Sequence, residues 1–314
     1  MYLLRGLIVS GALFALVYAC VSATIAFSAR ILVSWARHFL PARSAALLFA
    51  LRIAPLLMAI AITTVFAIPS FLRFEPRTTD ESIGYPAIVL SVLGITVIAA
   101  GITRAWLACG RSARQVAEWV KSSESSTSYL GVPAFSTAND APLLAVAGLR
   151  SPKLLISTGA AAQFSEQEMR AAIAHELAHV RRRDNFSKMF LRLCFFPGMK
   201  PLERGWLAAV EMAADDASVS SEREALDLAS ALIKVSRLAP AVRTPELAMS
   251  LVPEASGLAQ RVQRLLAWKT PSRSPSKRAR FTAVFAGVFA LAVLAIMHSP
   301  ALAGMHAVTE ALIR

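Results

Sequence analysis

The chain has 314 residues and is strongly apolar, with 56% hydrophobic residues, 17% charged residues and a mean hydropathy of +0.54. These values argue against two ordinary soluble domains and favour one soluble domain combined with membrane spans. The formal net charge is +13, but much of the excess lies beside apolar segments, where it suits anionic lipid head groups. We therefore expect no direct binding of nucleic acid.

Four apolar segments predict membrane-spanning helices. Each is close to the roughly 20 residues that a helix needs to cross the hydrocarbon core of a bilayer. The second segment begins one turn after Arg52 and would otherwise be a buried core helix, so three spans are the alternative to four. The segments are Leu7–Phe27, Leu56–Leu72, Ala87–Thr103 and Phe281–Met297.

The first segment differs from a cleaved signal peptide. Its apolar run is longer than the roughly 7–15 residues of a signal core. The run continues past Cys20, and a cluster of basic residues (Arg30, Arg37 and Arg43) follows it. We therefore interpret this segment as a retained span.

Lys and Arg residues beside the spans predict which side of the membrane each loop faces. Cytoplasmic loops carry an excess of these residues, and such clusters lie between the first two spans, after the third and before the fourth. Arg5, on the expected external side, is the one exception. The pattern predicts a multi-pass protein of the cell inner (cytoplasmic) membrane, with residues 110–268 in the cytoplasm.

Residues 110–280 are the only stretch large enough for a soluble domain. Short apolar runs bounded by Pro and Gly predict strands at 142–148 and 153–159, whereas "SSESSTS" (122–128) predicts a linker. The capping box "SEQE", which begins at Ser165, predicts the start of a helix. Further helices are expected at 185–196, 203–219, 221–238 and 257–268, followed by a basic Ser/Pro-rich linker at 269–280.

The stretch "AAIAHELAHVRRRDN" (171–185) places His175 and His179 four residues apart, with Glu176 directly after the first. On a helix this spacing puts both imidazoles on one face, where they can bind one metal ion. Zinc accepts neutral imidazoles and, in hydrolases, keeps one position for water. Glu176 faces a neighbouring part of the helix surface and can act on that water as a general base. The alternative is a pair of ordinary helix histidines with a surface glutamate.

A zinc peptidase site needs a third protein ligand. The downstream carboxylates Glu203, Glu211, Asp215 and Asp216 are the candidates. The stretch "EMAAD" places Glu211 and Asp215 on one helical face, which suits one carboxylate on the metal and the other as the support of a ligand histidine. Asp184 is expected either to orient a ligand histidine or to form a surface pair.

The motifs "HELAHVRRRDN" and "EMAAD" resemble those of the BlaR/MecR-type antirepressor membrane zinc metallopeptidases and, more distantly, of HtpX-like membrane proteases. The resemblance implies that His175, His179 and Glu211 bind one Zn²⁺ and that Glu176 is the catalytic base. It also implies that the strand before the motif helix forms the sheet edge along which substrate lies by strand addition. The residues of that strand are Lys153, Leu154, Leu155, Ile156 and Ser157.

The expected fold is mainly α-helical, with about four transmembrane helices and a cytoplasmic α+β, zincin-like metallopeptidase domain inserted between the third and the fourth. Only 17 residues follow Met297, so we expect no C-terminal penicillin-binding sensor domain. The expected parts are a three-helix membrane region (1–109), the metallopeptidase domain (110–268), a linker (269–280), the fourth helix (281–298) and a short external tail (299–314).

We therefore expect a zinc-dependent endopeptidase of the HExxH, gluzincin type that cleaves a cytoplasmic or membrane-proximal protein, such as a transcriptional repressor in a signalling pathway. Quality control of membrane proteins in the HtpX manner is one alternative. A non-catalytic signal transducer that retains zinc is another, although a structural site has no need of Glu176. The expected partners are a protein substrate and the lipid bilayer, and the sequence leaves the oligomeric state open. If the chain processes itself, the cut is expected in the 269–280 linker.

Overall fold

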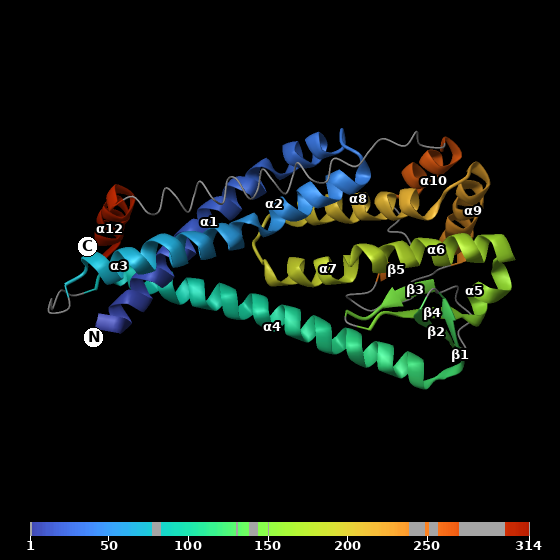
Figure 1. The fold of residues 1–314 in the computed structure, drawn as a ribbon, viewed down its shortest axis with the longest axis horizontal. Coiled ribbons are helices and arrows are strands. Elements are labelled where there is room, and N and C mark those ends of the chain that lie inside the picture. The colour runs from blue at the N-terminus through green and yellow to red at the C-terminus, as the bar shows by residue number, and fades with distance from the viewer. Residues whose placement is uncertain are drawn as a thin grey trace.

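The computed structural model describes residues 2–76, 83–129, 131–137, 144–149, 151–238, 249–250, 257–269 and 299–313. Most of these residues are helical, and a five-stranded sheet lies at one end of the molecule (Figure 1). The N-terminal end of helix α1 and the helix nearest the C-terminus lie at the opposite end, far from the sheet.

Three helical segments are long and apolar enough to cross a membrane. They have 34 to 37 residues, more than the roughly 20 that a bilayer core requires, so they extend beyond it. They contain the first three predicted spans, and the second meets the same criteria as the others; the predicted fourth span lies outside the described residues. The segments are α1 (Tyr2–Ala36), the run of α2 (Pro41–Ile62), the π-helix η1 (Thr63–Ala67) and α3 (Ile68–Phe74), and α4 (Tyr85–Lys121).

Arg5, the exception to the charge pattern, forms a buried ion pair. Its Nη2 atom lies 2.9 Å from Oε1 of Glu75, the residue that caps the C-terminus of α3. Both side chains are buried. The carboxylate of Glu75 thus balances the positive charge of Arg5 at this buried position.

Residues beyond the predicted fourth span form the helix α12 (Ser299–Ile313). This helix lies near α3 at the end of the molecule opposite the sheet (Figure 1). The Ser70 hydroxyl of α3 donates a hydrogen bond to the carbonyl oxygen of Leu302, at 3.0 Å. The contact fixes α12 against the same end of the long helices that holds the Arg5–Glu75 pair.

The sheet has the strand order β1-β2-β4-β3-β5. Only β2 and β4 pair in parallel; the other neighbours are antiparallel. The two predicted strands correspond to β3 and β4, but the predicted linker at 122–128 is wrong, because most of it forms β1. Pairing with β2 satisfies the backbone of this Ser-rich segment and overrides its composition. The strands are β1 (Ser123–Tyr129), β2 (Val132–Thr137), β3 (Leu144–Ala147), β4 (Lys153–Ser157) and β5 (Met249–Ser250).

The expectation that Lys153–Ser157 forms the sheet edge is also wrong. This strand, β4, pairs with β2 on one side and with β3 on the other. Both sides of its backbone are therefore already hydrogen-bonded, and it cannot accept an added strand. On the side of the motif helix, β3 is the next strand after β4, and among the described residues its outer side pairs only with the two-residue edge strand β5.

The predicted helices of the soluble region are present, and two buried clusters hold them. In the sheet core, α6 packs against the sheet and α9 through residues such as Leu154, Leu177 and Leu232. In the membrane-side core, α8 packs against α1 and α2 through residues such as Leu48 and Trp206. The helices are α5 (Thr158–Gln163), α6 (Glu166–Arg182), α7 (Asp184–Leu193), α8 (Lys200–Ser218), α9 (Glu222–Leu238) and α10 (Leu258–Leu266).

Glu168 joins the start of α6 to α9. The predicted capping box is present, because the Ser165 hydroxyl accepts from the Glu168 amide and the Glu168 carboxylate accepts from the Ser165 amide. The same carboxylate accepts hydrogen bonds from Ser230 and from the Lys234 ammonium group. Burial alone would raise the pKa of Glu168, but the bonds from Lys234, Ser230 and Ser165 outweigh it and lower the pKa to about 2.

We expect Glu168→Gln to destabilise the protein by about 1–3 kcal/mol at neutral pH, because charged hydrogen bonds between two helices are lost. An unfolded glutamate has a pKa of about 4.3, so the stabilisation is present above that pH and is lost as the pH falls towards 2. The difference between wild type and variant should therefore shrink on acidification. Thermal unfolding of detergent-solubilised protein at neutral and acidic pH measures this difference in stability. Glu166→Gln, which removes an exposed pair with Arg170, is the control; an equal loss in both variants would contradict the assignment.

Candidate metal centre

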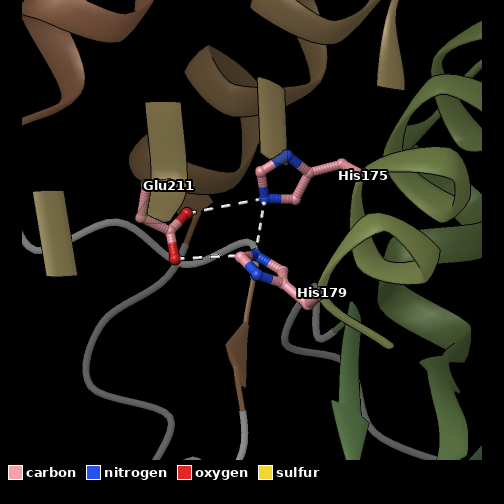
Figure 2. A group of neighbouring side chains, drawn as sticks. All are labelled: His175, His179 and Glu211. Carbon is pink, nitrogen blue, oxygen red and sulfur yellow. Dashed lines mark hydrogen bonds and ion pairs between the residues drawn. The ribbon is translucent and has the colours of Figure 1, made fainter. Parts of the chain in front are cut away.

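The helix α6 presents His175 and His179 toward Glu211 of α8 (Figure 2). Helical spacing puts both imidazoles on one face, and the opposite face of α6 is held in the sheet core by residues that include Ile173 and Leu177. Both histidines are fully buried, and Glu211 is partly buried. Three side chains that are distant in sequence therefore converge on one point.

The geometry of this group fits a single metal ion. The Nε2 atoms of His175 and His179 lie 3.2 Å apart, close to the roughly 3.3 Å between two nitrogens bound to one tetrahedral zinc. The Glu211 carboxylate lies 3.5 Å from Nε2 of His175 and 3.7 Å from Nε2 of His179. One ligand atom from each residue lies within 4.8 Å of the others. Two imidazoles and one carboxylate are a donor set that zinc accepts in hydrolases.

Each histidine has a carboxylate on its far side. The Nδ1 atom of His175 lies 3.0 Å from Oδ1 of Asp215, and Nδ1 of His179 lies 2.8 Å from Oδ2 of Asp184. Both aspartates are buried. A carboxylate on Nδ1 fixes the ring orientation and leaves Nε2 as the free nitrogen for a metal.

Glu176 lies beside the group but points to the sheet. Its Oε2 atom accepts a hydrogen bond of 3.0 Å from the amide of Val146 in β3. Its Oε1 atom is buried and has no hydrogen-bond partner among the described residues. Burial raises the pKa of Glu176 to about 8. The carboxyl group is thus fixed at one oxygen and available for a proton at the other.

Arg261 of α10 is a buried residue of the site that sequence reasoning missed. Its guanidinium group donates two hydrogen bonds to the carboxylate of Asp215, at 2.7 and 2.8 Å, and its Nη1 atom lies 2.8 Å from Oε2 of Glu211. Burial alone would raise the pKa of Glu211, but the charge of Arg261 outweighs it and lowers the pKa to about 2. One signal was available: Arg261 shares an apolar face of α10 with Leu258 and Leu265, where a charged residue requires a buried partner.

The remaining candidate ligands lie elsewhere in the described part of the chain. Asp216 points away from the group and pairs with the partly exposed Arg264, at 2.6 Å. Glu203 lies two turns before Glu211 on α8 and is not part of the converging group. Of the four carboxylates that the sequence left open, only Glu211 lies beside the Nε2 atoms of both imidazoles.

The family model of the BlaR1 peptidase M56 matches residues 12–265, which is most of the chain. The chain belongs to this peptidase family. A comparison with curated proteins finds no match. Membership implies a protease, and the apolar helices place this M56 peptidase in a membrane.

The candidate metal-binding group combines residues of two neighbouring helices, and each helix is also anchored in a different core. The histidines belong to α6, which the sheet core holds. Glu211 belongs to α8, which the membrane-side core holds, and Val210, directly before it, is buried in that cluster. The position of the Glu211 carboxylate therefore depends on how α8 packs against the membrane helices α1 and α2.

Gly205 allows α8 to approach those helices closely. A Cβ atom at this position would lie 3.0 Å from both Cγ atoms of Val33 in α1. We expect Gly205→Leu to displace α8 at a cost of about 1–3 kcal/mol and to weaken zinc binding by roughly 5–150-fold. Competition with a chromogenic chelator measures the affinity. Gly110→Leu, where a Cβ would meet nothing within 4 Å, is the matched control, and unchanged affinity in Gly205→Leu would contradict the coupling.

Proposed function

We propose that the chain is a membrane-anchored, zinc-dependent endopeptidase of the gluzincin type, with His175, His179 and Glu211 as ligands. The convergence of these three side chains beside a buried Glu176 is the observation that supports it most directly. A structural zinc site has no use for a fourth, non-ligand carboxyl group at this position. The proposed substrate is a cytoplasmic or membrane-proximal protein, and a transcriptional repressor is the proposed example.

In this proposal Glu176 is the general base and, later, the general acid. Bound zinc would polarise the scissile carbonyl group and lower the pKa of a water molecule. Glu176 Oε1 takes the proton of that water and passes it to the leaving amine. The bond from the Val146 amide holds the other oxygen, so the carboxyl group keeps its position through both proton transfers.

Asp215 and Asp184 are positioning residues in the same mechanism. Each holds the Nδ1 side of one ligand histidine, at 3.0 and 2.8 Å. Such partners raise the basicity of the imidazole and fix the orientation of its ring. Arg261 in turn holds Asp215 by two hydrogen bonds, which extends the support of His175 to α10.

The strand that best suits substrate binding is β3. Its outer side accepts an antiparallel segment of the same chain, with Ala145 opposite Ser250 and Val146 opposite Met249. A substrate that displaces this two-residue segment can pair with β3 in the same way, through main-chain hydrogen bonds. Val146 also donates to Glu176, so a peptide on this edge lies next to the base. Any self-processing would therefore be sought near 249–250 as well as in the 269–280 linker.

Comparative proteomics tests the proposed function in cells. Glu176→Gln should cause the substrate to accumulate, because the variant binds protein but does not cleave it. Accumulation of one transcriptional repressor would support signalling, whereas accumulation of many membrane proteins would support quality control. Identical proteomes of wild type and variant under every inducing condition would contradict a peptidase function.

We further propose that the zinc domain faces the cytoplasm at the inner membrane. Reporters fused after Ser122, at Thr79 and at the C-terminus test this arrangement. The first should report a cytoplasmic position and the second an external one. An external C-terminus would support four spans, and a cytoplasmic one would leave three. A reporter after Ser122 that faces outward would contradict the proposed orientation.

A further inference from the structure

The connection between α7 and α8 is strongly apolar. Its residues 193–199, "LCFFPGM", carry no charge, and Arg192 and Lys200 flank them. Both helices run back from this connection toward the sheet, so the tip of the α7–α8 hairpin points to the opposite end of the molecule (Figure 1). An apolar stretch with basic flanks is typical of a segment that enters the hydrocarbon core of a bilayer, because long basic side chains can reach back to the head groups.

Contacts with α1 place the hairpin tip at the depth of a membrane span. The Tyr18 hydroxyl donates a hydrogen bond of 2.6 Å to the carbonyl oxygen of Phe195. The rings of Tyr18 and Phe196 meet edge to face, with centroids 6.2 Å apart. Tyr18 precedes Phe27, the end of the first predicted span nearer the sheet, by nine residues. At 1.5 Å per helical residue, Tyr18 lies about 13 Å inside that end.

Contacts with α4 give a similar depth. Phe196 and Val97 pack against one buried cluster. A Cβ atom on Gly101 would clash with the carbonyl oxygen of Leu193, so α7 touches the backbone of α4 there. Both α4 residues lie within the third predicted span, Ala87–Thr103, and Val97 is about 9 Å inside its end nearer the sheet. Two membrane helices thus place the tip inside the hydrocarbon layer.

The backbone of the tip is suited to this position. Polar backbone groups in hydrocarbon need partners within the protein. The Phe195 amide donates to the carbonyl oxygen of Leu193, at 3.1 Å, and the Phe195 carbonyl accepts from Tyr18. Pro197 has no N–H group that would need an acceptor. The hydrogen bond from Tyr18 therefore satisfies a carbonyl group that lipid could not.

The exposed surface of the tip continues the lipid-facing surface of α4. Phe195 is 39% exposed, and the guanidinium group of Arg104 lies 4.4 Å from the centre of its ring. Ile102 and Trp106, on the same part of α4, are also exposed. Trp and Arg at the end of a span mark the level of the head groups. The Phe195 ring thus lies beside a membrane helix, next to the residues that mark this level.

We propose that the α7–α8 hairpin is a re-entrant membrane element. Its tip, residues 193–199, lies in the leaflet on the side of the zinc domain, and the Phe195 ring contacts lipid acyl chains. The tip is thereby set apart from the rest of residues 110–268, which lie outside the bilayer. Helix α7 has 10 residues and begins at Asp184, beside His179, so the metal-binding group lies only about 15 Å from the tip. The proposal depends neither on the peptidase function nor on the orientation of the chain.

Photolabelling of the unmodified, full-length protein tests this contact. Nanodiscs contain a phosphatidylcholine with a diazirine in its acyl chain, and mass spectrometry locates the adducts after illumination. The lipid probe should label the peptide that contains residues 193–199, as it labels the peptide around Ile102. It should not label the peptide around Leu226, an exposed leucine of α9. A water-soluble diazirine should label Leu226 and leave the tip unlabelled.

Two results would overturn the proposal. Labelling of the tip by the soluble probe to the same extent as Leu226 would place the tip in water. A tip that neither probe labels would mean that protein, and not lipid, covers Phe195.

Phe195→Asp provides a second measurement. A carboxylate is unfavourable in hydrocarbon, so lipid labelling of the tip should fall by roughly tenfold or more, and labelling by the soluble probe should rise. Leu226→Asp introduces the same charge at an exposed apolar residue and should keep the wild-type pattern. Unchanged lipid labelling of the tip in Phe195→Asp would contradict the contact. If this variant does not fold, the labelling of the unmodified protein decides.

Discussion

Replacing Glu176 with glutamine is expected to leave the metal bound and to reduce peptidase activity by about 10²–10⁴-fold, the usual contribution of a general base. Glutamine has the shape of glutamate and can still accept the hydrogen bond from the Val146 amide, so the sheet and α6 should keep their positions. It cannot take a proton from water at Oε1. The loss should appear in kcat, because the variant still binds the peptide along β3.

Metal content and kinetics measured on the same preparation check this prediction. Elemental analysis should find about one zinc per chain in wild type and variant, and peptides that wild type cleaves in a proteome-derived peptide library supply the substrate for kcat and KM. Glu222→Gln, at an exposed position in the first turn of α9, is the matched control and should retain full activity. Full activity of Glu176→Gln would refute its role as base, and loss of zinc would instead make Glu176 a ligand.

The histidine half of the site follows from the sequence because it is local. His175, Glu176 and His179 lie within two turns of one helix, so the period of 3.6 residues fixes their relative directions before any tertiary contact forms. Asp184 lies five residues after His179, and the tight passage from α6 to α7 through the left-handed Arg183, with φ of 57°, places it beside that imidazole. Local geometry is enough to select these residues as candidates.

The other half of the site depends on packing that no local pattern contains. Glu211 shares its helix with Glu203, Asp215 and Asp216, and the packing of α8 against α1, α2 and α6 determines which carboxylate faces the imidazoles. Arg261 reaches Asp215 across 46 positions of the chain, so its role depends on where α10 docks.

The order of strands in the sheet also could not be predicted from local sequence patterns. The short apolar runs predict β3 and β4 as strands, but the order of strands in the sheet is a tertiary property. The parallel pairing of β2 with β4 encloses β4 and leaves β3 nearer the edge. Side-chain periodicity cannot reveal this order, because both strands are almost wholly buried and neither shows alternation. The β1 strand is missed for the opposite reason, since its Ser-rich sequence carries no apolar pattern at all.

Glu211→Ala is expected to remove zinc almost as completely as His175→Ala does. The variant retains two imidazoles on adjacent turns, which hold a zinc ion far less tightly than three protein ligands. The fold should survive, because Arg261 keeps its two hydrogen bonds to Asp215 when its contact with Glu211 is lost. Zinc content after dialysis and affinity from chelator competition measure the effect, and thermal unfolding confirms that the protein is intact.

Two further variants on the same helix test whether Glu211, and not another carboxylate of α8, is the third ligand. Asp215→Asn should weaken zinc binding by only about 10–100-fold, as expected for a residue that acts through His175. Glu203→Ala, two turns earlier on α8 and outside the converging group, should bind zinc like wild type. Zinc affinity is therefore expected to be highest in Glu203→Ala, lower in Asp215→Asn, and lowest in Glu211→Ala and His175→Ala. Loss of zinc in Glu203→Ala together with retention in Glu211→Ala would contradict the assignment of Glu211 as the third ligand. It would also mean that α8 packs against the membrane helices in a different register.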